Sequence, residues 1–201
     1  MGEILTRAGL VAPAALLVGW RRGEGLLVTA HVEGHGLLER FAALDRAGAD
    51  ARAARRNLCR LLGREVARLH RAGIVHGDLV PTNLRVCGAQ LCFLDNDRTR
   101  RLPFAIGARR NLVQLGRFVV PGVTLTDRVR VLRAYAAERG LSRSARHRLG
   151  FWVMRKVTAR RCAIDGIPPA QASRVGFRRL MRAGGPFDPA LRPTRAQEPS
   201  P

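Results

Sequence analysis

The chain has 201 residues, 46% of them apolar, which suits one domain, or one large lobe with a fragment of another, and excludes a chain without a real core. Its formal net charge of +21, nearly all from arginine, predicts an anionic partner. Nucleic acid, acidic lipid and a phosphorylated glycolipid are each candidates for that partner. A genome that favours arginine codons would also raise the number of arginines.

The first thirty residues predict the end of a small sheet. Apolar runs at residues 16–20 and 25–30 flank an Arg-Arg-Gly-Glu turn, as the two strands of a hairpin do. The apolar run 10–20 is too short to span a bilayer and lacks the small-residue cleavage site of a signal peptide. Glu3 is interpreted as a surface charge. We expect a cytoplasmic protein, at most peripheral on the inner membrane.

Two helices are predicted next. Residues 37–44 form the first. The second is marked by an apolar side chain every three or four positions, at Leu58, Leu62, Val66 and Leu69. Gly73 is typical of a residue that ends a helix.

The segment after this helix, HGDLVPTNL at residues 76–84, predicts a phosphotransfer site. Asp78 and Asn83 lie five residues apart on one loop, close enough to converge on one phosphate. Apolar-rich runs at 84–87 and 91–94 predict a hairpin, which would return Asp95 beside Asn83. Phosphoryl transfer needs a carboxylate for the proton of the attacking hydroxyl and oxygen ligands for magnesium, and these three side chains supply both.

Asp and Asn in loops commonly form turns and caps, and a D-x-x-x-x-N pattern alone often arises by chance. Here the pattern extends to His76, the preceding helix, the hairpin and a second aspartate. The order of helix, loop, hairpin and aspartate is the layout of the C-terminal lobe of protein-kinase-like enzymes.

The chain resembles one family in particular, the lipopolysaccharide core sugar kinases that phosphorylate Kdo or heptose. The resemblance rests on AGIVHGDL at 72–79, on Asn83 and Leu84, and on LDNDRT at 94–99, which is similar to the family's I-D-F-D-R-A segment. Segments 110–115 and 127–135 also resemble helices of that family, so the likeness covers about residues 25–140.

The resemblance implies an α+β, protein-kinase-like fold: a remnant of the N-lobe sheet and hinge at 1–34 and a mainly helical C-lobe at 35–183. The Pro-rich composition of residues 184–201 predicts a disordered tail. The resemblance also implies ATP-dependent phosphorylation of a sugar hydroxyl with magnesium. The implied roles are Asp78 as catalytic base, His76 as the residue that braces the loop, Asn83 and Asp95 as metal ligands, and Val32, Glu33 and Gly34 as the hinge that meets adenine.

Two further positions carry open interpretations. Asp97 either assists the metal or pairs with Arg98. Asn111 stands where related enzymes carry an aspartate that holds the backbone of the catalytic loop, so weaker support is expected there.

The chain departs from the family in one respect. Nothing before the catalytic loop resembles a Gly-rich phosphate loop, and the only lysine is Lys156, far downstream. Either the sequence is incomplete at its start, or the protein is a pseudoenzyme without ordinary nucleotide clamping. The intact Asp78, Asn83 and Asp95 favour the first explanation.

Other function classes remain as alternatives: a kinase-like enzyme acting on a small molecule or protein, and a catalytically silent basic binding protein. The C-terminal region is basic, and it is interpreted either as a phosphate-binding surface or as a solvated helical face. Its arginines are Arg143, Arg146, Arg148, Arg155, Arg160, Arg161, Arg174, Arg178, Arg179 and Arg182. Aromatic platforms are scarce there, and Phe151, Trp152 and Phe177 have the spacing of core positions. We therefore expect nucleic acid to bind only non-specifically, whereas an anionic glycolipid or sugar acceptor and the acidic inner leaflet are the favoured partners. The oligomeric state is not indicated.

The four cysteines, Cys59, Cys87, Cys92 and Cys162, lack metal-ligand spacing. Small apolar packing is their expected role, in a reducing compartment.

Overall fold

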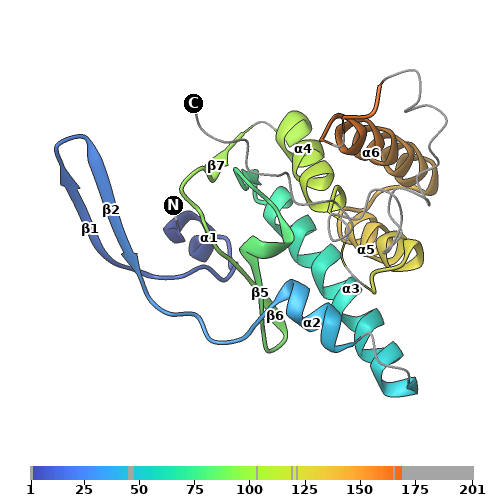
Figure 1. Cartoon of the computed structure of the whole chain (residues 1–201), viewed down its shortest axis with the longest axis horizontal. Helices are drawn as coiled ribbons and strands as arrows, with labels where there is room; N and C mark the ends of the chain where they lie inside the picture. The colour runs from blue at the N-terminus through green and yellow to red at the C-terminus, as the bar shows by residue number, and fades with distance from the viewer. Residues whose placement is uncertain are drawn as a thin grey trace, which may run out of the picture.

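The computed structural model describes residues 2–44, 48–102, 104–118, 120, 122–164 and 166–168. It is an α+β structure in which small sheets lie against a helical body (Figure 1). In chain order the elements are α1 (Gly2–Arg7), β1 (Ala15–Arg21), β2 (Glu24–Thr29), β3 (His35–Gly36), α2 (Leu37–Ala43), α3 (Ala49–Arg71), β4 (Ile74–Val75), the 3-10 helix η1 (Pro81–Asn83), β5 (Leu84–Cys87), β6 (Gln90–Phe93), β7 (Arg100–Arg101), α4 (Phe104–Gly116), α5 (Leu125–Glu138) and α6 (Arg143–Ile164). The expected tail at 184–201, together with Arg174, Phe177, Arg178, Arg179 and Arg182, lies outside the described residues.

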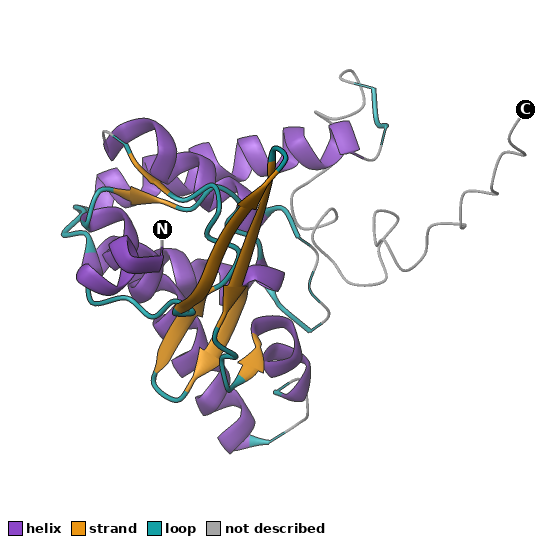
Figure 2. Ribbon diagram, turned by 90° about the vertical axis from the view of Figure 1, so that its left-hand side faces the viewer, coloured by secondary structure: helices purple, strands orange, loops and turns teal. Residues whose placement is uncertain are grey.

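The predicted N-terminal hairpin is confirmed. Strands β1 and β2 pair antiparallel, with Arg21 opposite Glu24 at the turn. Both faces of the hairpin are exposed, and Trp20 is 79% exposed. Figure 1 shows the hairpin projecting from the helical body, and in Figure 2 it lies in front of that body.

The segment before the hairpin is docked on the body instead. Leu5 and Leu10 are buried in the core, and the Arg68 guanidinium donates to the Gly9 carbonyl across 2.9 Å. Glu3 is exposed and pairs with Arg7 at 3.1 Å, as expected for a surface charge. The position of this segment therefore depends on apolar packing rather than on the hairpin.

Helix α3 runs through the centre of the body, and the four apolar positions that predicted it are all buried. Helix α5 packs directly on it. Gly63 permits this close approach, because a Cβ atom at that position would lie 2.3 Å from the Val131 carbonyl oxygen. Gly73 follows the helix with a φ of +70°, the left-handed conformation in which glycine ends helices at little cost.

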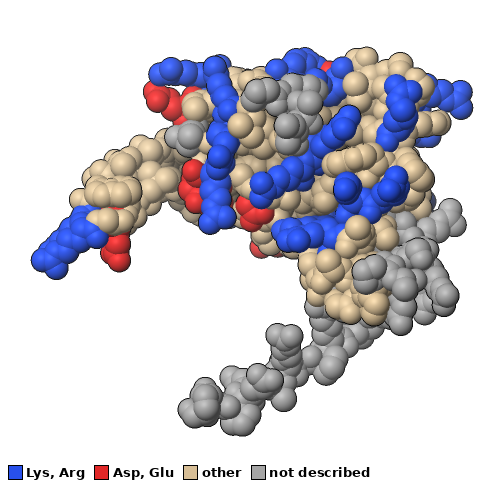
Figure 3. Space-filling model, turned by 90° about the horizontal axis from the view of Figure 1, so that it is seen from above, with Lys and Arg blue, Asp and Glu red and all other residues tan. Residues whose placement is uncertain are grey.

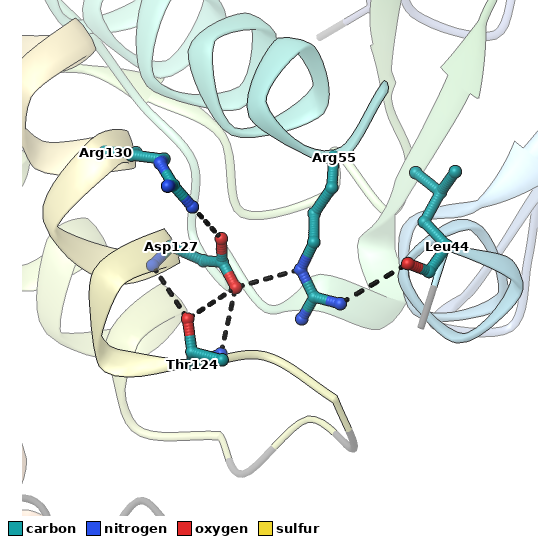
Figure 4. A network of polar contacts seen from close by, with 5 residues as sticks. All are labelled: Leu44, Arg55, Thr124, Asp127 and Arg130. Carbon is teal, nitrogen blue, oxygen red and sulfur yellow. Dashed lines mark hydrogen bonds and ion pairs between the residues drawn. The ribbon is translucent and has the colours of Figure 1, made fainter. Parts of the chain in front are cut away.

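The start of α5 is joined to α3 by a buried carboxylate (Figure 4). Asp127 closes a capping box with Thr124, accepting from its amide at 3.0 Å and from its hydroxyl at 2.8 Å. It also accepts from Arg55 of α3 at 2.9 Å and from Arg130 at 2.8 Å. Burial alone would raise the pKa of Asp127, but the bonds from Thr124 and Arg55 hold it below its ordinary value.

Helix α6 corrects two expectations. Phe151 is 59% exposed rather than a core residue, and Trp152 is partly buried between the Arg109 guanidinium and the Lys156 ammonium, 5.5 and 6.0 Å from its ring centroid. Arg161 is buried and so does not belong to a solvated face. Trp152 lies where α6 packs on α4, through its contact with Arg109.

All four cysteines are free thiols, and three of them are buried, as small apolar side chains often are. Within the part of the chain that the structure describes, no helix has the length and apolar character needed to cross a bilayer.

Candidate active site

Secondary structure fixes the catalytic loop at both ends. Strand β4 leads into it and pairs antiparallel with β7, while η1 and β5 follow it. Gly77 lies so close to the chain at Arg98 that an added Cβ would fall 2.0 Å from the Arg98 Cβ. The loop is therefore held against the segment that carries Asp95.

The Asn83 side chain lies between the backbone of Asp78 and the carboxylate of Asp95. Asn83 donates through Nδ2 to the Asp78 carbonyl at 3.0 Å, and the same atom lies 3.4 Å from Asp95 Oδ2. The hairpin brings Asp95 back, because β5 and β6 pair with Leu84 opposite Phe93 and the Leu94 amide donates to the Asn83 carbonyl at 2.9 Å.

The backbone at Asp95 has a left-handed conformation, with φ of +54°. Such a conformation is uncommon outside glycine, although aspartate tolerates it better than most residues. It is held from both sides: His76 donates to the Leu94 carbonyl at 2.8 Å, and the Asn96 side chain donates to the Phe93 carbonyl at 2.6 Å. Asp95 is thus an exposed carboxylate on a constrained backbone, an arrangement common at functional sites.

His76 is fully buried and braces the loop. Its Nδ1 accepts from the Asp78 amide at 3.2 Å, so Nε2 must carry the proton that it donates to the Leu94 carbonyl. Burial lowers the pKa of His76, which keeps the ring neutral in this tautomer. The geometry agrees with a bracing role, in which the ring joins the catalytic loop to the Asp95 segment.

Helix α4 supplies a stronger brace than its sequence suggests. Asn111 is fully buried; its Oδ1 accepts from the His76 amide at 3.0 Å and its Nδ2 donates to the His76 carbonyl at 2.6 Å. Weaker support was expected at this position, but the Asn111 amide both accepts from and donates to His76, and so holds the two peptide groups that flank the His76 Cα. An aspartate could only accept here.

A second layer of buried polar side chains supports Asn111. His70 Nε2 lies 3.2 Å from Asn111 Oδ1, and His70 Nδ1 lies 3.0 Å from the Tyr135 hydroxyl. Burial lowers the pKa of His70 to about 4, so this ring is neutral at pH 7. His70 and Tyr135 were not found from the sequence, and the only signal was their polar character on otherwise apolar helix faces.

The predicted hinge, residues 32–34, packs against strand β5. The Cys87 thiol donates to the Glu33 carbonyl at 3.1 Å, and Arg85 donates to the Gly34 carbonyl. Gly34 has a φ of +125°, and a Cβ there would meet the Val86 carbonyl at 2.4 Å, so glycine is required. Strand β5 is about 10 Å long. The hinge therefore runs along the same strand that starts beside Asn83.

Asp97 pairs with Arg98 at 3.7 Å, and both side chains are exposed. Lys156 lies on α6 over Trp152, which is not a position on the predicted nucleotide hinge. Among the described residues there is no cluster of three His, Cys, Asp or Glu side chains that could hold a metal unaided.

A cavity of about 620 Å³ among the described residues does not include Asp78, Asn83 or Asp95. Its lining is apolar and comes mostly from α2 to α6, with Phe41, Leu62 and Leu112 among the contributors. We place the candidate site at Asp78, Asn83 and Asp95, because the predicted phosphotransfer needs carboxylate and amide groups, which the apolar lining of this cavity does not offer.

Comparison with known proteins gives the family. Residues 3–135 match the profile of the lipopolysaccharide kinase (Kdo/WaaP) family. The chain belongs to this family. The match covers the predicted site and all the helices that support it up to Tyr135 of α5. The resemblance noted from the sequence is confirmed.

A solved structure of WaaP in complex with acyl carrier protein is similar, with a TM-score of 0.60 over 77% of this chain and 71% of that one. At 24% identity the likeness shows the fold, and it confirms the kinase-like α+β architecture. A probable serine/threonine-protein kinase BUD32 homolog of Archaeoglobus fulgidus is 45% identical over 40 residues, and the KEOPS complex subunit Bud32 of Pyrococcus abyssi is 34% identical over 70. The matched stretches span 20% and 29% of those two relatives.

Proposed function

We propose that the chain is an ATP-dependent phosphotransferase that phosphorylates a sugar hydroxyl of the lipopolysaccharide core, Kdo or heptose. The observation that carries the proposal is that Asn83 contacts both the backbone of Asp78 and the carboxylate of Asp95, on two segments braced by buried hydrogen bonds. Family membership supports the kinase class. The choice of sugar rests on the resemblance of the motifs at 72–79 and 94–99.

In this proposal Asp78 accepts the proton of the attacking hydroxyl. The backbone at Val32, Glu33 and Gly34 receives the adenine of ATP, and the nucleotide extends along β5 toward Asn83. We assign residues up to 34 to the nucleotide-side lobe and those from 35 onward to the C-lobe that carries the chemistry.

The donor set at Asn83 and Asp95 fits magnesium. Both side chains offer hard oxygen atoms, and Asn83 Oδ1 is free to face a cation because Nδ2 is held by the Asp78 carbonyl. Magnesium commonly uses one or two protein ligands together with substrate phosphates, so a pair of protein ligands is enough. When bound, the ion would neutralise charge on the transferred phosphate.

The surface is suited to an anionic acceptor. Helices α4 and α6 contain no acidic side chain, and Figure 3 shows Lys and Arg spread over the face seen from above, with few acidic side chains among them. We propose that this charge attracts a phosphorylated core glycolipid or the acidic inner leaflet. Salt screens the attraction between exposed charges over about 8 Å at physiological ionic strength, so this binding should weaken as salt is added.

Phosphate transfer is the direct test of this proposal. With γ-labelled ATP, magnesium and deacylated core oligosaccharide at physiological salt, the protein should transfer label to the oligosaccharide. Duplex DNA should bind at low salt only, because phosphate neutralisation without base reading is salt-sensitive. Label on a small molecule or protein instead would favour the alternative kinase, and no transfer at all would favour a silent basic binding protein.

Removing either proposed metal ligand should weaken magnesium-dependent nucleotide binding. We expect Asp95→Ala and Asn83→Ala each to lower the affinity for magnesium-ATP roughly tenfold, equivalent to about 1.4 kcal/mol. The measurement is calorimetric titration with and without magnesium. Asp97→Ala is the matched control, and its own loss of affinity would instead support the metal-assisting role for Asp97. Unchanged affinity in the Asp95 and Asn83 variants would leave both as turn-forming residues.

A further inference from the structure

Gln114 of α4 is a nearly buried side chain that contacts three consecutive residues of the catalytic loop. Its Nε2 donates to the Gly77 carbonyl at 3.1 Å and to Asp78 Oδ1 at 3.3 Å. Its Oε1 lies 3.4 Å from the Leu79 amide, which donates to it. One side chain therefore reaches the backbone before and after Asp78 as well as the carboxylate itself.

The backbone of the loop determines which end of the Gln114 amide faces Asp78. The His76 amide donates to Asn111 Oδ1 and the His76 carbonyl accepts from Asn111 Nδ2, so the orientation of Asn111 is fixed. Asn111 Nδ2 then donates to Gln114 Oε1 at 2.8 Å. Because Oε1 must face that donor, Nε2 is turned toward Asp78, and a flipped amide would face donor with donor and acceptor with acceptor.

The Asp78 carboxylate has few other restraints. Among the described residues, Gln114 supplies the one hydrogen bond that reaches it, at Oδ1. Oδ2 is thereby the oxygen available to an acceptor hydroxyl. A general base works only within hydrogen-bond reach of the proton that it takes, so the rotamer of this carboxylate matters to the rate.

We propose that Gln114 is a positioning residue for phosphotransfer, whose amide holds Asp78 Oδ1 and so presents Oδ2 to the acceptor hydroxyl. This inference rests on the proposed function, since it takes Asp78 as the base. Gln114 itself touches no substrate in this role. It acts through Asp78.

A purely structural role would predict a different response to substitution. Gln114→Glu keeps the shape and can still accept from Asn111 and Leu79, but it replaces the donor beside Asp78 with a second carboxylate. Gln114→Met keeps similar bulk and removes every hydrogen bond. If only the bonds to the backbone and to Asn111 mattered, glutamate would be the milder change, because of these it loses only the bond to the Gly77 carbonyl. If the donor to Asp78 matters, both variants should lose turnover.

The experiment measures kcat and KM for magnesium-ATP with deacylated core oligosaccharide, per mole of folded protein determined by circular dichroism. Both Gln114 variants should lower kcat roughly 10–100-fold, because small misplacements of a reacting group have large effects, with KM changed less than about twofold. Thr124→Ala, which removes the hydroxyl that caps the start of α5 far from the loop, is the matched structural control and should lower thermal stability without changing kcat.

Activity of Gln114→Glu near that of the wild type would overturn the positioning role and leave the proposed function standing. The same holds if turnover falls only in proportion to the unfolded fraction of the protein, as in the Thr124 control. A wild-type protein without transfer to any acceptor would overturn the proposed function, and the role of Gln114 with it.

Discussion

Asp78→Asn is expected to lower phosphate transfer by roughly 10²–10⁴-fold, the range typical of losing a general base. Asparagine keeps the shape of the side chain but cannot accept the proton of the attacking hydroxyl. The Asp78 amide would still donate to His76, and the Asp78 carbonyl would still accept from Asn83, so the loop should keep its conformation.

The measurement is transfer of labelled phosphate under saturating magnesium-ATP, with nucleotide affinity determined on the same preparation. We expect affinity to change little, since Asp78 is not assigned to the metal. Asp50→Asn, at an exposed carboxylate near the start of α3, controls for the loss of one negative charge. Equal turnover in wild type and Asp78→Asn would remove Asp78 from the mechanism.

Asp127→Ala should destabilise the fold by about 3 kcal/mol. The substitution removes the Asp127 carboxylate from its ion pair with the largely buried Arg55 and opens the capping box at the start of α5. Removing one partner of a buried ion pair costs about 3–5 kcal/mol, and we take the lower end because Arg130 is exposed enough to be rehydrated.

Urea unfolding checks this value through the change in midpoint. Glu3→Ala removes the exposed partner of Arg7 and should shift the midpoint little, because exposed ion pairs contribute little. Since the pKa of Asp127 is lowered in the fold, its stabilisation is present above the ordinary aspartate pKa of about 3.9 and is lost as the pH falls through the lowered value. Similar midpoints for both variants would show that the buried carboxylate contributes no more than a surface one.

The sequence alone predicted the elements whose signals are local. The apolar spacing of Leu58, Leu62, Val66 and Leu69 predicted α3, because an α-helix repeats every 3.6 residues whatever packs on it. Two short apolar runs around a Gly-containing turn predicted the β5–β6 hairpin, and a hairpin of known length returns the chain to its start. That geometry is why the residue spacing alone was enough to predict Asp95 beside Asn83.

Only the tertiary structure decided which polar side chains support the site. Asn111 lies 35 positions after His76 and Gln114 lies 37 positions after Gly77, and Asp127 meets Arg55 across 72 positions. A polar residue on a helix looks the same in sequence whether it faces water or a buried peptide group. The same ambiguity made Phe151 look like a core residue when it is 59% exposed. The packing of α4 against the loop and of α5 on α3 resolves this ambiguity. A polar side chain buried there without a hydrogen-bond partner would cost free energy, so each one must meet a partner across the contact.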